Sequence, residues 1–207
     1  MSDTRMPKTA HITRLFRTAT PEQIDTAVNW YADAHEVASA LAVKNGVWIG
    51  TAAGIIAACS PMLSWGANVN LAARLMKEGG LTSGYLKSNL AKANRILAGE
   101  VPLDVLGGDK VRAFYLGIFH AGRTTAVCID RHAWSLAVNH RYAEGNIPTL
   151  KGKRYAAAQE AYTRAARILS IEYGRDLTPP MVQSVTWVLW RAKFWAEGAF
   201  DNFDAEL

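Results

Sequence analysis

The stretch LGGDKVRAFYLGIFHAGRTTAVCIDRHAW, residues 106–134, places a glycine pair and a lysine before an apolar helix and an Asp-Arg-His-Ala-Trp segment after it. Gly107 and Gly108 predict a tight turn whose backbone amides can approach a phosphate. Lys110 stands at the start of the helix, and Asp130 follows where a second helix is expected to begin. A turn, a helix and a short loop can bring this amine and this carboxylate to one cleft, as nucleophilic attack on an electrophilic carbon requires.

With its surroundings, this stretch resembles the helix-hairpin-helix (HhH-GPD) DNA glycosylases, the superfamily of endonuclease III and 8-oxoguanine glycosylase. That family carries a glycine hairpin, a lysine at the start of a helix, and then an aspartate in a pattern close to Val-Asp-x-His. Here GDKV (108–111) stands at the hairpin and IDRHAW (129–134) at the acid. AGEVP (98–102) and KSNLAKANRIL (87–97) are similar to the segments that lead into the hairpin, so the resemblance covers roughly residues 48–138.

The chain departs from the family pattern in two places, as a divergent member would. The family hairpin usually reads Leu-Pro-Gly-x-Gly, whereas residues 104–108 read DVLGG. The first hairpin helix must therefore be short, between Pro102 and Gly107. The family's common glutamine, in the loop that fills the gap left by a flipped base, is not evident, and CSPMLSW (59–65) occupies that region.

The resemblance implies an all-α, two-lobed helical fold of the helix-hairpin-helix DNA glycosylase type, with a central cleft and no iron–sulfur cluster. We expect residues 1–19 to form a basic N-terminal arm. Residues 20–46 would pack with 150–207 in one lobe built from the two ends of the chain. Residues 47–149 would form the central lobe that carries the hairpin.

The composition describes a globular, mildly basic chain. Half of its 207 residues are hydrophobic and the formal net charge is +5, which suits a polyanionic partner without requiring one. Cys59 and Cys128 lie in apolar runs and are too few for a four-cysteine iron–sulfur cluster or a usual structural zinc site. We therefore expect two buried thiols, no metal and no cofactor.

The pattern also bears on location. The N-terminus has no apolar core of the signal-peptide type, and no run approaches the roughly 20 apolar residues of a membrane span. We expect a cytoplasmic monomer with no membrane partner, associated with the nucleoid or with the cytoplasm of a phage-infected host cell.

Capping residues and apolar spacing predict roughly eight to ten helices. Thr20-Pro21 begins a helix that is expected to run to Gly46, and residues 48–59, apolar on nearly every side, predict the central buried helix. Further helices are expected over 64–78, 82–97, 111–120, 130–140 and 154–173, and after Thr178, where Trp187, Trp190, Phe194 and Trp195 predict core packing.

Lys110 and Asp130 are the catalytic candidates. The resemblance implies that Lys110 attacks C1′ of the target nucleotide and forms a Schiff base, and that Asp130 activates the nucleophile or stabilises the charge that develops on the sugar. On the residues alone, Lys110 can equally bind a DNA phosphate or face solvent, and Asp130 can simply cap a helix.

The other candidates concern the DNA. Gly107 and Gly108 would grip a phosphate, or form an ordinary turn; Arg131 and His132 would contact DNA, although His132 can also be structural. Phe114 and Trp134 would line a base pocket, or belong to the core. The turn that carries Ser60, Ser64, Trp65 and Asn68 would face the DNA, or be a capped turn with a packed tryptophan.

Three functions follow from these features. The first is a DNA base-processing enzyme, a DNA glycosylase in repair, which binds double-stranded DNA, flips a modified or damaged base and cleaves its N-glycosidic bond, with strand cleavage if Lys110 forms the Schiff base. The second is a phage-type DNA-modification transferase that attaches an amine or amino acid to an activated 5-hydroxymethylpyrimidine. The third is a non-catalytic DNA-binding protein that keeps the fold.

Overall fold

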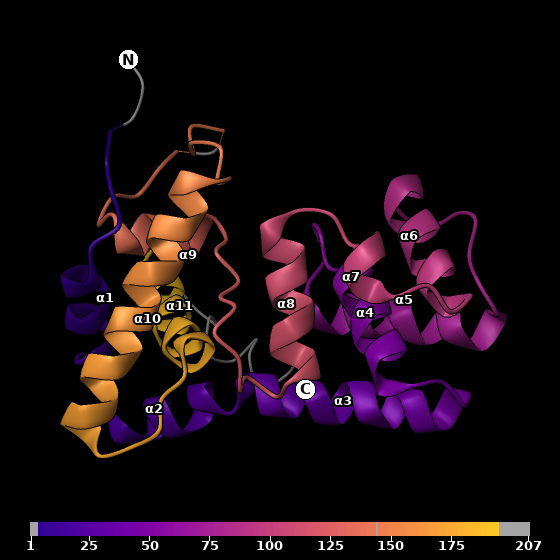
Figure 1. Ribbon diagram of the computed structural model, residues 1–207, viewed down its shortest axis with the longest axis horizontal. Coiled ribbons are helices and arrows are strands. Elements are labelled where there is room, and N and C mark those ends of the chain that lie inside the picture. The colour runs from indigo at the N-terminus through magenta and orange to yellow at the C-terminus, as the bar shows by residue number, and fades with distance from the viewer. Residues whose placement is uncertain (1–3, 144, 195–207) are drawn as a thin grey trace.

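The computed structural model describes residues 4–143 and 145–194, and every regular element in this part of the chain is a helix (Figure 1). The all-α expectation is confirmed. The helices are α1 (Thr9–Phe16), α2 (Pro21–Val28), α3 (Trp30–Asn45), α4 (Ile49–Cys59), α5 (Trp65–Glu78), α6 (Lys87–Leu97), α7 (Pro102–Val105), α8 (Asp109–Phe119), α9 (Arg131–Ala137), α10 (Lys153–Tyr173) and α11 (Pro179–Phe194).

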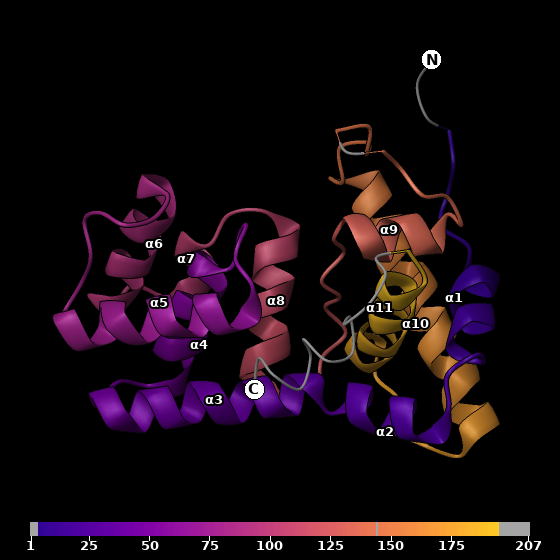
Figure 2. The same cartoon turned by 180° about the vertical axis from the view of Figure 1, so that it is seen from behind.

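Two hydrophobic clusters divide the helices into two lobes, which lie side by side in both views (Figures 1 and 2). The terminal lobe consists of α1, α2, α9, α10 and α11, packed around side chains such as Phe16, Trp134 and Tyr162. The hairpin lobe consists of α3–α8, packed around Ile55, Ile56 and their neighbours. The described residues thus build two cores, and the catalytic candidates come from opposite sides of the boundary.

Two glycines fix the position of the hairpin within its lobe. A Cβ on Gly54, in the central helix α4, would lie only 2.9 Å from Pro102, the first residue of α7. A Cβ on Gly117, in α8, would lie 2.4 Å from the ring of Tyr31 on α3. Because real Cβ atoms do not approach other atoms so closely, both helix contacts depend on glycine.

Tyr31 also joins the two lobes. Its hydroxyl lies 3.4 Å from Oε1 of Gln183 on α11, and its side chain is buried in the core of the hairpin lobe. A second link runs from the Thr178 hydroxyl, which donates to the carbonyl oxygen of Gly122 at 2.7 Å. The first bond holds α11 against α3, and the second holds the start of α11 against the loop that leads from α8 to Asp130.

The sequence suggested that the N-terminal segment is an extended arm, but the structure shows a packed helix there. Residues 9–16 form α1, whose Ile12 and Phe16 are fully buried in the terminal lobe. The Lys8 amide donates to the Ala137 carbonyl at 2.8 Å. In the sequence, the basic residues of this segment draw attention away from its apolar face. Ile12, Leu15 and Phe16 form that face and pack against the core.

The helix expected from Thr20 to Gly46 is broken at Asn29. The Asn29 side chain donates to the Asp25 carbonyl at 2.9 Å, a local bond that competes with continuation of the helix. Beyond the break, α3 packs with α4 and α8 in the hairpin lobe, while α9 packs in the terminal lobe. Each of these two helices therefore lies in the other lobe from the one expected. Residues 195–207, which were expected to belong to the terminal lobe, lie outside the described part of the chain.

Most other boundaries agree with the sequence, with two differences. The helix expected over 82–97 begins only at Lys87, and the one expected over 130–140 ends at Ala137. No single helix in the described ranges is long and apolar enough to cross a membrane; Pro21–Asn45 and Ile49–Cys59 would qualify only as a pair, and they are bent by 115°.

Candidate functional site

The hairpin presents an exposed turn at the surface, from Gly107 to Lys110. Gly108 adopts φ +81° and caps α8, and the Arg112 side chain donates to the Leu106 carbonyl at 2.8 Å, which fixes the turn. The first amides of a helix have no partner within the helix and can receive an anion. The Lys92 ammonium comes within 3.5 Å of the place where a Cβ on Gly107 would stand. Sequence reasoning missed Lys92, because only the packing of α6 brings it here.

Asp130 is held by three N–H donors. One carboxylate oxygen accepts from the amides of His132 at 2.9 Å and Ala133 at 2.7 Å, so Asp130 caps α9. The other accepts from the indole N–H of Trp187 on α11 at 2.9 Å. Trp187, expected to be a core residue, is only partly buried and orients this carboxylate.

Lys110 and Asp130 converge on the same two side chains. Burial raises the pKa of the Cys128 thiol to about 12. The negative charge of Asp130 adds to this rise, and the positive charge of Lys110 opposes it. The pKa of His132 is lowered, chiefly by burial; Asp130 opposes this, and Arg131, Arg191 and Lys110 add to it. The Lys110 side chain is exposed and the Asp130 carboxylate is fixed by its donors, and the charges of both act on Cys128 and His132.

His132 lies among the charged groups that act on it. Only 7% of its surface is exposed, and Nε of Arg131 donates to its Nε2 at 3.2 Å. Its ring stands edge-on to Trp187 at 5.9 Å, and the Arg191 guanidinium lies over the Trp187 ring at 4.6 Å. The positive charges of Arg131, Arg191 and Lys110 thus help to lower the pKa of His132.

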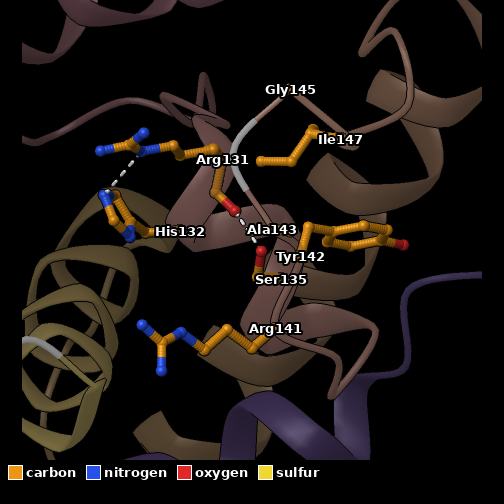
Figure 3. A pocket seen from close by; sticks show the side chains of 8 residues that line it. All are labelled: Arg131, His132, Ser135, Arg141, Tyr142, Ala143, Gly145 and Ile147. Carbon is orange, nitrogen blue, oxygen red and sulfur yellow. Dashed lines mark hydrogen bonds between the residues drawn. The ribbon is translucent and has the colours of Figure 1, made fainter.

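A pocket of about 590 Å³ opens beside His132, between α9 and the segment that follows it (Figure 3). We call it the cationic pocket. Figure 3 shows the guanidinium groups of Arg131 and Arg141 on the same side, with His132 between them. The pocket is lined by Arg131, His132, Ser135, Arg141, Tyr142, Ala143, Gly145 and Ile147.

A second pocket, of about 480 Å³, lies between the lobes, with α8 on one side and α10 on the other. Asp109 and Arg112 line it from the hairpin lobe, and Tyr155 and Gln159 from the terminal lobe. The Tyr155 hydroxyl donates to the Val127 carbonyl at 2.7 Å, which supports the irregular segment before Asp130. This pocket contains none of the sequence-predicted site residues.

Phe114 and Trp65 come together in an aromatic cluster at the lobe boundary. Trp30 joins them, with its ring centroid 5.2 Å from Trp65 and 5.9 Å from Phe114. Phe114 is four residues after Lys110 on α8, and such a spacing places two side chains on one helix face. Trp30 was missed because the break at Asn29 that positions it is not evident in the sequence.

Two predicted site residues are in the wrong place for their proposed roles. Trp134 is fully buried in the terminal lobe, where its indole donates to the Tyr142 hydroxyl at 3.3 Å, so it cannot line a base pocket. Asn68 is 2% exposed and cannot reach DNA, because it lies on the inner face of α5. Its Oδ1 has no hydrogen-bond partner within the described ranges.

The rest of the 60–65 turn remains accessible. The Ser64 side chain caps α5 by accepting from the Ala67 amide at 3.4 Å, and the Ser60 hydroxyl donates to the Ala57 carbonyl at 2.9 Å. Between them stands Met62, which is 93% exposed and has φ +65°. A non-glycine residue in this conformation is strained, and such strain concentrates at functional sites. An exposed methionine gave no signal in the sequence.

In the described ranges, no three His, Cys, Asp or Glu side chains are arranged to hold a metal ion. Residues 1–194 match a family of unknown function, DUF7178, and the chain belongs to that family. No curated protein and no solved structure matches the chain.

Proposed function

We propose that the protein is a DNA base-processing enzyme with the helix-hairpin-helix glycosylase fold, which flips a modified or damaged base and cleaves its N-glycosidic bond. The observation that carries the proposal is the convergence of Lys110 and Asp130. Their charges act on the same thiol and imidazole although they lie in different lobes. A structural lysine at a helix start would not need a fixed carboxylate across the lobe boundary.

In this proposal Lys110 is the nucleophile. Its exposed amine would attack C1′ of the target nucleotide as the base leaves, and the resulting Schiff base would permit strand cleavage at the same site. Asp130 would stabilise the positive charge that develops on the sugar. Its three fixed N–H donors suit that role, because a carboxylate that is oriented in advance costs no reorganisation during the reaction.

The DNA would be held by the hairpin and the 60–65 turn. The α8 amides after Gly108, with the Lys92 ammonium beside Gly107, suit one backbone phosphate. The exposed Met62 side chain suits a wedge between base pairs, because apolar side chains inserted at a base step stabilise a kinked duplex. The aromatic cluster of Trp30, Trp65 and Phe114 would stack on the extruded base.

The intact mass of duplex oligonucleotides after incubation with the protein tests this function. Each duplex carries one unusual base: uracil, 8-oxoguanine, an alkylated purine, hydroxymethyluracil or phosphorylated hydroxymethyluracil. Candidate amines are added to the phosphorylated form, whose phosphate group they can displace. Loss of one base identifies a glycosylase and its substrate, whereas gain of mass on a retained base identifies the transferase. Unchanged masses together with DNA binding would leave only the binding function.

The variants Lys110→Gln and Asp130→Asn sharpen the assay. Both are expected to abolish base release, and borohydride should trap the wild-type protein, but not Lys110→Gln, on its substrate. Lys77→Gln, an exposed lysine on α5, is the matched control and should react like the wild type. A Lys110→Gln protein with full activity would contradict the role of Lys110.

A further inference from the structure

We infer that the cationic pocket is a binding site for a small organic phosphate of about mononucleotide size. At about 590 Å³ it falls within the range of small-molecule sites, roughly 300–1,000 Å³. A phosphate of the DNA backbone needs only surface donors, so a concave pocket indicates a ligand with a body as well as a charge. The inference rests on the pocket itself and not on the proposed glycosylase function.

One wall of the pocket is built to receive an oxyanion. Arg131 and Arg141 present their guanidinium groups on the same side of the pocket (Figure 3). A guanidinium offers paired N–H donors that match two phosphate oxygens. Both arginines are also held: Arg131 donates to His132, and the Arg141 guanidinium lies 5.5 Å from the centre of the Phe194 ring.

The charge around this wall favours a phosphate over a carboxylate. The positive charges of Arg131, Arg191 and Lys110 all act on His132, and Asp130 is the acidic group that acts on it. The carboxylate of Asp130 already accepts three N–H donors. Among the described residues, Arg131, Arg191 and Lys110 take part in no ion pair. A dianion would balance this excess better than a singly charged group.

The remaining lining accounts for the organic part of the ligand. Tyr142, Ala143 and Ile147 line the pocket away from the two guanidinium groups. Phosphate alone would leave this apolar part unfilled, whereas a nucleoside monophosphate places its phosphate on the arginines and its sugar and base along the apolar part. The same nucleotide chemistry can come from a free nucleotide or from the phosphorylated end of a DNA strand.

Isothermal titration and thermal unfolding with deoxynucleoside 5′-monophosphates test the inference. Parallel titrations use inorganic pyrophosphate and one oligonucleotide with and without a 5′-phosphate. The wild type should bind a mononucleotide and unfold at a higher temperature with it. Arg131→Gln and Arg141→Gln should each weaken binding about tenfold or more, because each removes a charge-assisted donor pair. Arg14→Gln, an exposed arginine on α1, is the matched control and should bind normally.

The outcomes separate the sources of the ligand. Binding of the free mononucleotide supports a free nucleotide, and binding only of the 5′-phosphorylated oligonucleotide supports a strand end. No binding of either, or equal binding by wild type and both arginine variants, overturns the inference. Failure of the glycosylase proposal would instead appear as an inactive wild type in the oligonucleotide assay, with nucleotide binding unchanged.

Discussion

At the scale of single residues, Asp130 combines a structural and a chemical role. Asp130→Ala should lower the free energy of unfolding by about 1–3 kcal/mol, because α9 loses its cap and the Trp187 N–H loses its acceptor. Asp130→Asn keeps a capping oxygen and should cost less. Both variants should lose base-releasing activity, since neither carries the negative charge. Denaturant unfolding and the oligonucleotide assay measure the two effects.

Trp187→Phe is the control that separates them. It removes the indole donor and keeps the carboxylate, so it should reduce stability modestly and leave a substantial part of the activity. An Asp130→Asn protein as active as the wild type would show that the charge is not needed.

The two cysteines should be inert in the native protein. Burial raises the pKa of both Cys59 and Cys128 to about 12, and the thiolate is the reactive form. We expect slow alkylation by iodoacetamide at pH 8 and rapid alkylation of both thiols in denaturant, read by mass spectrometry. Because the thiol pKa is higher in the folded protein, the folded state is fully stable with respect to thiol ionisation below the unfolded thiol's pKa, near 8.5. The free energy of unfolding should fall as the pH rises from there toward 12. Fast native alkylation would contradict the burial.

At the scale of helices, capping and helix-breaking residues correctly predicted helix ends where the signal lies within a few residues of the boundary. Thr20 and Pro21 begin α2, Gly46 ends α3 in a left-handed conformation, and Ser64 caps α5. The break at Asn29 could not be predicted, because asparagine is tolerated in many helices and the bond from its side chain to the Asp25 carbonyl is not evident in the sequence. The aromatic cluster built on Trp30 was unpredictable for the same reason.

The close approach of α8 and α3 gives a prediction at this scale. Gly117→Ala should destabilise the protein by about 1–3 kcal/mol, because the new Cβ would press on the Tyr31 ring. Gly66→Ala, in α5, is the matched control: nothing lies within 4 Å of its Cβ, so it should be neutral or slightly stabilising. Denaturant titration of both variants measures the difference. Equal stabilities would mean that α8 shifts freely on α3.

At the scale of the whole molecule, the sequence predicted an all-helical fold, but not which lobe each helix joins. Trp134 is an example of a residue assigned to the wrong environment. It follows the polar residues Asp130, Arg131 and His132, which suggested a functional segment, but Trp134 lies in the core of the terminal lobe with Ala133 and Leu136. The assignment depends on contacts between distant segments, such as α1 with α10, and no local pattern contains them.

The two separate cores predict a divided response to core mutations. Leu75 and Leu169 are both fully buried, one in each lobe, and replacing either with alanine should cost about 2–5 kcal/mol. In native-state hydrogen exchange, Leu75→Ala should expose the amides of α4–α6 more than those of α10, and Leu169→Ala should do the reverse. Identical exchange patterns would show that the lobes unfold as one unit.

The unequal anchoring of Asp130 and Lys110 has a consequence for the evolution of the family. Relatives that had lost all chemistry would still be selected to keep Asp130, because α9 and Trp187 depend on it. The Lys110 side chain makes no hydrogen bond or ion pair in the described structure and could drift without harm to folding. A lysine retained at this position across DUF7178 would therefore be a record of selection for activity, whereas a retained aspartate alone would record only selection for the fold.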